Sequence, residues 1–411
     1  MLLHAGILAS ACAADKRRVR TRIGNDTIGV DSVPPLRQLR RAGLCRCHHH
    51  ISGGTMKYQC AHRWAFSAWG GQLAEQEDAL APAVGHEVTV RVTHCGMCHS
   101  DLHLQAGGFD MGGGKLSSFE RAGIKLPVTM GHEIVGEVVE IGHEVSGVAV
   151  GTQVVVYPWL GCGECTTCQS GDEHLCVKAA RNMGFHEPGG YADTARVPHE
   201  KYLVPIGSLD PARAATFACA GITALSAIRK LPSAAADGWI AVIGCGGVGM
   251  TGVALLSATS TAKIVAIDPD PAKRESALAH GAALAFDPGA ADALKTINKA
   301  CGFNVSGVID FVGSEASSTL AVNLVRRAGT VVIVGLFGGE FKMPLPMFAL
   351  KSISIIGSYV GGLNELRELV ALAQKKTLPE IPLDRRPLAT VNEALDDLTH
   401  GRVVGRVVLQ P

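Results

Sequence analysis

The stretch VIGCGGVG, residues 242 to 249, decides the fold of this chain. Gly244, Gly246 and Gly249 form the spacing G-x-G-x-x-G between an apolar run and a helical one. The first glycine permits a tight turn, the second lets a pyrophosphate approach the backbone, and the third allows close packing of helix on strand. The free N–H groups at the start of the helix can then bind phosphate. The stretch therefore predicts a nucleotide-binding turn.

The segments around this turn, from about residue 210 to 357, alternate between two patterns. Continuous apolar runs predict buried strands, and the Ala-rich segments between them predict helices; the runs are WIAVIG, KIVAIDP, GVIDFVG and GTVVIVG. This alternation is typical of a parallel, doubly wound sheet. The glycine triplet alone would be weak in a chain with 49 glycines, and this context strengthens it.

The strand KIVAID ends in Asp268, which indicates the kind of dinucleotide. An acid at this spacing accepts hydrogen bonds from the adenosine ribose hydroxyls, and its charge would repel a 2′-phosphate. We therefore expect NAD rather than NADP. Lys273 and Arg274 stand nearby and are the residues that would favour NADP instead.

Composition excludes several classes of protein. With 411 residues the chain can form two domains, and its net charge of +1 gives no argument for a nucleic-acid partner. No run reaches the roughly 18 apolar residues of a membrane span. The 13 cysteines are odd in number and many lie at short spacings, which favours metal ligands over disulfides. We therefore expect a reducing compartment, the cytoplasm.

The first 55 residues differ from the rest. They are rich in arginine between Lys16 and Arg46 and show no strand or helix period. The opening MLLHAGILASACAAD resembles a signal peptide without its basic start, and a mitochondrial-type presequence would be richer in serine. The alternative that we favour is a start at Met56, with residues 1–55 as a disordered or spurious extension.

From Met56 to about residue 205, short alternating apolar runs broken by glycine predict a β-rich domain. Within it lies CGECTTCQSGDEHLC, which carries four cysteines: Cys162, Cys165, Cys168 and Cys176. Four thiolates on one small loop fit a tetrahedral structural zinc ion, although an iron–sulfur cluster accepts the same ligands. Free thiols would leave this glycine-rich loop without a core. A site with four protein ligands holds a loop and does not catalyse.

A second group of metal-ligand types is spread along the chain. HCGMCHSDLH, residues 94 to 103, contains Cys95, Cys98 and His99 in the pattern C-x-x-C-H, which can mean covalent haem attachment. The missing signal peptide and the nicotinamide site argue against haem. GHE supplies His132, and CAGIT supplies Cys219. Two thiolates and one imidazole fit a catalytic zinc ion with an open fourth position, although each residue alone is more often structural.

Taken together, these motifs resemble the zinc-dependent alcohol dehydrogenases of the medium-chain dehydrogenase/reductase superfamily. The resemblance begins at about Met56 and rests on GMCHSDLH, GHE, the four-cysteine lobe, CAGIT, GCGGVG and Asp268, in that order. It implies an α/β protein with a GroES-like catalytic domain and a Rossmann coenzyme domain. The implied ranges are 56–219 with 358–411 for the catalytic domain, 159–178 for its zinc lobe, and 220–357 for the coenzyme domain.

The resemblance also implies residue roles at the metal. Cys98, His132 and Cys219 would bind the catalytic zinc, and Cys95 would not. Ser100 would lie next to the substrate oxygen, and His103 would pass the proton to solvent. Asp101 and Glu133 match carboxylates that lie near the metal without binding it, as ligating imidazoles require.

For the coenzyme, the resemblance places His99 and Arg406 at the pyrophosphate and Thr223 and Val248 beside the nicotinamide ring. Together with the residues of the glycine turn and its surroundings, the predicted cofactor-binding set is His99, Thr223, Gly244, Gly246, Gly247, Val248, Gly249, Asp268, Lys273 and Arg406. The implied cofactors are NAD and two zinc ions per chain.

The segment 104–130 is longer than in the family and borders the substrate channel there. Its tract GGFDMGGG predicts a flexible loop. Phe109 and Met111 would either line the pocket or lie on a mobile surface loop.

The activity implied is reversible hydride transfer between a primary or secondary alcohol and NAD, giving an aldehyde or ketone. Two alternatives stay open: an aldehyde or quinone reductase of the same architecture, and a non-enzymatic zinc- and nucleotide-binding protein. By resemblance, the partner of the chain is a second copy, in a homodimer or homotetramer.

Overall fold

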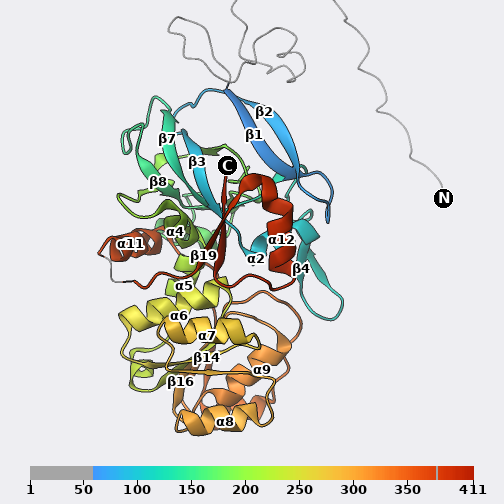
Figure 1. Ribbon diagram of the computed structural model, residues 1–411, viewed down its shortest axis with the longest axis vertical. Helices are drawn as coiled ribbons and strands as arrows, with labels where there is room; N and C mark the ends of the chain where they lie inside the picture. The colour runs from blue at the N-terminus through green and yellow to red at the C-terminus, as the bar shows by residue number, and fades with distance from the viewer. Residues whose placement is uncertain (1–58, 376–377) are drawn as a thin grey trace, which may run out of the picture.

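The computed structural model describes residues 59–375 and 378–411, so the predicted N-terminal extension, 1–55, lies outside the described residues (Figure 1). A β-rich part lies at the top of Figure 1 and an α/β part below it, and the C-terminal segment returns to the upper part. The predicted fold class is thereby confirmed.

A seven-stranded sheet forms the β-rich part, and β3 (Val88–Gly96) is its centre. β3 pairs antiparallel with β7 (Glu133–Ile141) and with the C-terminal strand β20 (Arg406–Gln410). The strand order is β12-β8-β7-β3-β20-β19, and β11 also pairs with β3. These further strands are β8 (Gln153–Val156), β11 (Thr194–Val197), β12 (Leu203–Pro205) and β19 (Leu383–Pro387).

Three smaller sheets flank this one. One has three strands and the other two have two strands each. Their strands are β1 (Gln59–Phe66), β2 (Ala74–Leu80) and β6 (Val128–Thr129) in the first, β4 (Gly108–Asp110) and β5 (Leu116–Ser118) in the second, and β9 (Trp159–Leu160) and β10 (Arg181–Asn182) in the third.

The segment 104–130 differs from its prediction. The tract expected to be a flexible loop forms β4 and the turn of a hairpin with β5, because its glycines adopt the left-handed conformation that the turn requires. A Cβ on Gly112 would lie 2.3 Å from Cγ of Glu340, and a Cβ on Gly338 would lie 2.8 Å from Cβ of Asp110. The hairpin tip therefore packs against the loop around residues 338–340 of the α/β part.

The α/β part contains a six-stranded parallel sheet in the order β15-β14-β13-β16-β17-β18. From β13 the chain first adds strands on one side, as far as β15, and then on the other side, from β16 to β18. Ligands of such sheets bind outside the carboxyl ends of the strands at the point of this change, between β13 and β16. The strands are β13 (Trp239–Ile243), β14 (Lys263–Ile267), β15 (Leu284–Phe286), β16 (Val305–Asp310), β17 (Thr330–Ile333) and β18 (Ser354–Gly357).

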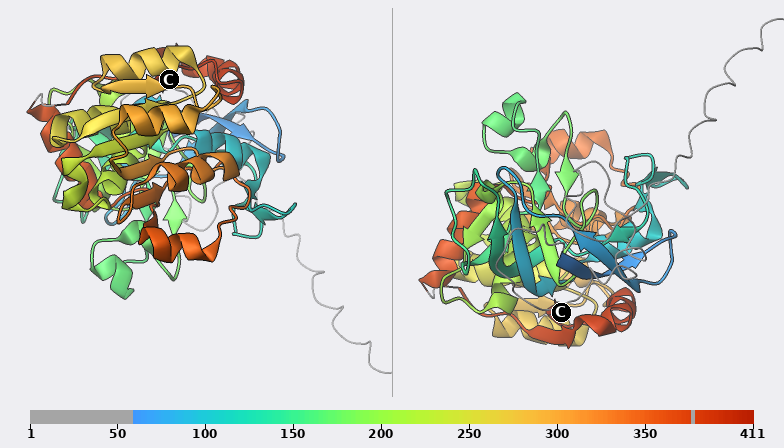
Figure 2. Two further views of the ribbon diagram at one scale, coloured as in Figure 1. Left: turned by 90° about the horizontal axis from the view of Figure 1, so that it is seen from below. Right: turned by 90° about the horizontal axis from the view of Figure 1, so that it is seen from above.

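Helices cover this sheet, and apolar cores fill the space on its two faces (Figure 2). The continuous apolar runs in the sequence are explained by this burial on both sides. The helices of this part are α6 (Gly247–Thr259), α7 (Pro271–Ala279), α8 (Ala293–Ala300), α9 (Glu315–Leu324) and α10 (Leu345–Lys351). Those packed with the β-rich part include α2 (His99–Ala106), α5 (Ala220–Arg229), α11 (Leu363–Gln374) and α12 (Val391–Thr399).

Helix α5 joins the two parts. It contributes Ile222 and Leu225 to the core of the β-rich part and Ala227 to a core of the α/β part. Cys219 lies at the break between Pro211–Ala218 and α5, where the chain bends by 53°. In the described part of the chain, this bent pair together has the length and composition of a membrane span, and no single helix does. The predicted domain boundary at residues 219 and 220 coincides with the bend and stays a prediction.

The third glycine of the turn gives a test of the fold. A Cβ on Gly249 would lie 1.7 Å from the carbonyl oxygen of Gly244, so Gly249→Ala must push α6 away from β13. We expect the free energy of unfolding, measured by urea denaturation, to fall by about 2 kcal/mol or more. Gly246→Ala is the matched control, because nothing lies within 4 Å of its Cβ. Equal stability of the two variants would contradict this packing role.

Candidate metal centres and nucleotide crevice

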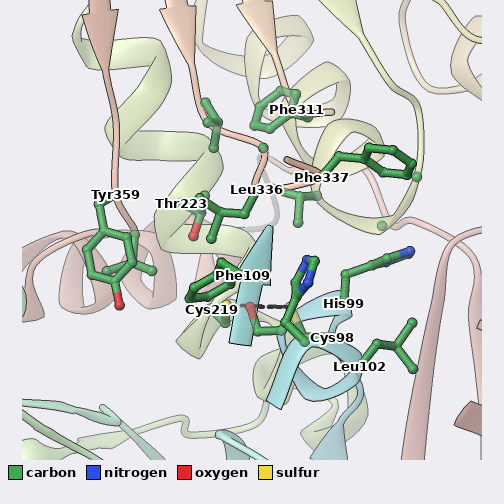
Figure 3. Close-up of a pocket in the computed structure, with 18 of the residues that line it drawn as sticks. Cys98, His99, Leu102, Phe109, Cys219, Thr223, Phe311, Leu336, Phe337 and Tyr359 are labelled. Carbon is green, nitrogen blue, oxygen red and sulfur yellow. Dashed lines mark hydrogen bonds between the residues drawn. The ribbon is translucent and has the colours of Figure 1, made fainter. Parts of the chain in front are cut away.

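Three predicted metal ligands from distant parts of the chain meet at one place. Cys98 follows β3, His132 precedes β7, and Cys219 begins α5. The sulfurs of Cys98 and Cys219 are 3.9 Å apart (Figure 3), and ligand atoms of both lie within 4.8 Å of His132 and Glu133. Two sulfurs on a tetrahedral zinc ion, each about 2.3 Å from it, would be about 3.8 Å apart. The arrangement therefore fits a zinc site.

The imidazole of His132 supports this fit. The side chain is fully buried, and neither ring nitrogen has a hydrogen-bond partner in the described residues. Its Nδ1 lies 3.4 Å from Oδ1 of Asp101. The other carboxylate oxygen of Asp101, Oδ2, accepts hydrogen bonds from the Cys98 amide and the Tyr191 hydroxyl. A buried unpaired nitrogen is rare unless a metal or water satisfies it. Asp101 thus lies where the resemblance placed a carboxylate that orients the ligand.

Charges at the centre favour metal binding. Hydrogen bonding from Cys219 holds the pKa of the Cys98 thiol well below its usual range, against the effect of burial, and His132 acts in the same direction. The pKa of Cys219 is raised, because its proton is shared with Cys98 and the site is buried. Burial opposes a charge on His132, but Asp101 and Cys98 raise its pKa to about 10. A cation is therefore stabilised at this position.

Glu133 and Arg406 form a buried ion pair behind the metal ligands. Glu133 Oε1 also accepts from the amide of Ala220 at 3.3 Å. Burial raises the pKa of Glu133 to about 7, although Arg406 opposes the shift. A Cβ on Gly247 would lie 2.3 Å from Cδ of Arg406, so this arginine also touches the glycine turn. Its predicted contact with the pyrophosphate stays a prediction.

Cys95 does not join the cluster. It is fully buried, and its sulfur contacts the backbone around Gly96, Gly131 and Gly190. Burial raises the pKa of its thiol well above the usual value. The C-x-x-C-H pattern therefore does not act as one unit in this fold.

The four-cysteine lobe forms a second compact group, with its sulfurs within 4.8 Å of one another. The Sγ atoms of Cys165 and Cys168 are 3.4 Å apart, and those of Cys162 and Cys168 are 3.9 Å apart. Cys176 accepts from the amides of Cys162 and Ala179, and these backbone donors, against desolvation, lower its pKa to about 6. Amide donors to sulfur stabilise thiolates, as a structural zinc ion requires.

The predicted relay residues lie at the same cavity as the metal ligands. Ser100 Oγ is 3.7 Å from Cys98 Sγ, and the His103 ring lies 5.1 Å from the ring of Phe109. His99 and His103 both line the cavity (His99 is seen in Figure 3). Burial, reinforced by the charge of His99, lowers the pKa of His103. The lowered pKa favours the neutral form of His103, which can accept a proton.

The nucleotide turn opens into this cavity, which has a volume of about 530 Å³. Thr223 and Val248 line it together with the glycine turn, so the metal ligands and the crevice of the parallel sheet share one space. The lining residues from the turn are Gly244, Gly246, Gly247, Val248 and Gly249.

Asp268 lies beside the turn, at the end of β14. Its carboxylate accepts from the amides of Cys245 at 2.7 Å and Asp270 at 2.9 Å. Lys273 Nζ lies 3.6 Å from Asp270, and Arg274 donates to the backbone carbonyl of Asp268. Among the described residues, neither cation forms an ion pair with the Asp268 carboxylate. The contact of Asp268 with the adenosine ribose stays a prediction.

Sequence reasoning missed several aromatic residues of the cavity. Phe119, Trp159, Phe185 and Tyr359 line it, and Phe109, for which two alternatives were open, lines it as well. Met111 is 57% exposed and lies outside the lining. The missed residues come from four different segments and share no spacing, so no local pattern in the sequence marks them.

Comparison with known proteins agrees with this geometry. The family model described as "Alcohol dehydrogenase GroES-like domain" matches residues 85–208, and the one described as "Zinc-binding dehydrogenase" matches residues 247–375. An NAD-dependent alcohol dehydrogenase of Sulfurisphaera tokodaii is 34% identical over 83% of this chain and 97% of its own length. An alcohol dehydrogenase of Geobacillus stearothermophilus is 36% identical over 79% and 92%.

Solved structures give the same result. The alcohol dehydrogenase of Aeropyrum pernix aligns with a TM-score of 0.77 at 30% identity, over 85% of this chain and all of its own. A cobalt- and zinc-bound alcohol dehydrogenase of Pyrobaculum aerophilum aligns with a TM-score of 0.73 at 28% identity, over 86% and 100%. This chain therefore belongs to the zinc- and NAD-dependent alcohol dehydrogenases of the medium-chain dehydrogenase/reductase superfamily.

Proposed function

We propose that this protein oxidises primary or secondary alcohols to aldehydes or ketones, as a general alcohol:NAD oxidoreductase with two zinc ions per chain. The observation that carries the proposal is the meeting of Cys98, His132 and Cys219 at the cavity into which the nucleotide turn opens. A zinc ion held there by three protein ligands supplies a Lewis acid with one open position.

The residues of the chain orient the alcohol and remove its proton. Ser100 lies beside Cys98 at the cavity and is assigned to the hydroxyl proton of the substrate. His103, half-buried and neutral because its pKa is lowered, is assigned to pass that proton to solvent. Asp101 and Glu133 hold the metal ligands and their surroundings in place. The metal ligands themselves are buried, which limits the access of water to the reacting atoms.

The coenzyme would bind along the glycine turn. We assign Asp268 to the adenosine ribose, and Thr223 and Val248 to the two sides of the nicotinamide. His99 and Arg406 are assigned to the pyrophosphate, and Lys273 to the adenosine end of the crevice. The NADP alternative is weaker because Arg274 is engaged by the backbone of Asp268 and Pro269.

Neither alternative activity is favoured. A protein that only binds zinc and nucleotide would not require a proton relay. Ser100 and His103, the residues proposed for that relay, line the cavity beside the metal ligands. An aldehyde or quinone reductase would use the same centre, but the named relatives are alcohol dehydrogenases. We further propose the cytoplasm as the compartment, because the nine cysteines whose side chains the structure describes are free thiols, and all nine belong to the two candidate metal sites or to the apolar cores.

A homo-oligomer is proposed from one edge of the α/β part. Strand β18 is the last strand of its sheet, and in the described structure it pairs only with β17. Beside it, apolar side chains are exposed on α10: Leu345 by 79%, Leu350 by 70% and Phe348 by 37%. A second copy of the chain would cover both the unpaired strand edge and this apolar group.

Replacing a catalytic metal ligand tests the proposed centre. We expect Cys219→Ser to lower kcat/KM for alcohol oxidation, followed by NADH absorbance, more than about a hundredfold, since even residues around the ligands matter tenfold to a hundredfold. Bound zinc should fall from two ions to one. Cys95→Ser is the control and should keep both ions and the activity. Unchanged activity in Cys219→Ser would remove this residue from the mechanism.

The zinc lobe should affect stability rather than chemistry. Cys176→Ser removes the sulfur that accepts two amide hydrogen bonds, so we expect the loss of one zinc ion and a melting temperature lower by several degrees. Activity measured well below the new melting temperature should persist. If the variant keeps two zinc ions and its melting temperature, the lobe is not a metal site.

A charged residue introduced into the exposed apolar group on α10 tests the proposed homo-oligomer. Leu345→Glu places a carboxylate in the exposed apolar group, and light scattering should then show smaller particles than for the unchanged protein. Val84→Glu is the control, because Val84 is 60% exposed but lies in the β-rich part. A monomer before any substitution would contradict the proposal directly.

A further inference from the structure

A series of aromatic rings leads from the metal centre toward the hairpin. The ring of the ligand His132 lies 5.5 Å from that of Phe185, Phe185 lies 6.0 Å from Phe119, and Phe119 lies 5.0 Å from Phe109. Phe119 and Phe185 are each 8% exposed, and Phe109 is half-buried. All three phenylalanines line the cavity (Phe109 is labelled in Figure 3). They form one aromatic wall.

A second group of rings extends from the same ligand. Trp159 lies 5.5 Å from His132, and Tyr359 lies 5.9 Å from Trp159 in an edge-to-face arrangement. Trp159 is fixed because its Nε1 donates to the carbonyl of Ala218 at 3.2 Å. The imidazole that would hold the metal therefore has an aromatic neighbour in each of two directions.

The charge of the cavity limits what it can bind. Among the described residues that line it, none is Asp, Glu, Lys or Arg. A charged substituent on a substrate would lose its hydration without gaining a partner, which is costly in a buried site. The titratable side chains that do line it are those of His99, His103, His186, Cys98, Cys219 and Tyr359, and such a lining favours a neutral, apolar substrate.

We infer that the substrate of this protein is a neutral aryl alcohol, with its ring near the carbon that bears the hydroxyl group. The inference rests on the proposed function and narrows it. Aromatic pairs prefer edge-to-face or offset contacts with centroids about 4.5–7 Å apart, and each ring pair of the wall lies in this range. The aromatic ring of a substrate can pack against the aromatic wall in the same way as the rings of the wall pack against one another. A short aliphatic alcohol would leave the apolar surface of the wall exposed to water.

The hairpin holds the outer half of this wall. Phe109 lies on β4, and the amide of Phe119 donates to Gly107 at 3.0 Å. The hairpin tip packs against residues 338–340 of the α/β part through Gly112 and Gly338. The segment that is longer than in the family thus supplies two of the three phenylalanines, and these two become specificity-determining residues.

The first experiment compares three alcohols with NAD and the zinc-loaded full chain. We expect kcat/KM for benzyl alcohol to exceed that for cyclohexylmethanol, which has nearly the same size but no π-system, about fivefold. It should exceed that for ethanol more than about tenfold, because ethanol covers little of the apolar wall. Equal values for the three alcohols would overturn the aryl preference alone. Oxidation of none of them would overturn the proposed function itself.

Two variants locate the preference. Phe109→Leu keeps an apolar side chain of similar volume but removes the outer ring, so the ratio of benzyl alcohol to cyclohexylmethanol should fall toward one. Phe119→Ala should lower the same ratio and also raise KM for benzyl alcohol. Met111→Ala, on the same hairpin but outside the lining, is the control and should keep the ratio. A ratio that is unchanged in Phe109→Leu would overturn the role of the wall.

Discussion

The pairing of β3 with β7 and β20 is the constraint on which the metal centre depends. Gly96 lies opposite Glu133 on β7 and opposite Val408 on β20. Cys98 and His132 therefore lie side by side where the chain leaves the sheet. In the sequence, 33 residues separate them, and these residues include the hairpin. A Cβ on Gly96 would lie 1.9 Å from Oε2 of Glu133, so only glycine leaves room for the carboxylate. A slip of one residue would turn these side chains to opposite faces.

That register matters energetically because the centre buries charge. Asp101 faces His132 and Glu133 faces Arg406, and all four side chains are buried. Removing one partner of a buried pair typically costs about 3–5 kcal/mol, because the other charge is left uncompensated. These ion pairs connect α2, β7 and β20. The same packing therefore positions the metal ligands and brings the buried charges together. Arg406 also touches Gly247, which carries the same constraint to the nucleotide turn.

Sequence predicted what is local and what the family shares. The glycine turn and the four-cysteine lobe were legible because their partners lie within about a dozen residues. The meeting of Cys98, His132 and Cys219 was suggested by their ligand types beside the nucleotide turn and was assigned by the resemblance, since no spacing joins residues so far apart. The hairpin and the aromatic wall were missed for a physical reason. Both rest on contacts between distant segments, the approach of Gly112 to Glu340 and the ring contact of Phe119 with Phe185, and such contacts leave no period in the sequence.

Different segments of the chain supply the residues proposed for the chemistry and those proposed for substrate specificity. The polar side chains of the cavity near the metal centre come from the start of α2 and from the residue before α5, where buried charge and metal geometry restrict substitution; they are Cys98, Ser100, His103 and Cys219. Two of the three phenylalanines of its aromatic wall come from residues 104–130, which supply no metal ligand. Because rings act through area and contact geometry, a change there alters which alcohol fits without altering the charges at the metal. The residues proposed to determine specificity therefore lie mainly in a segment that holds no metal ligand, apart from the residues proposed for the chemistry.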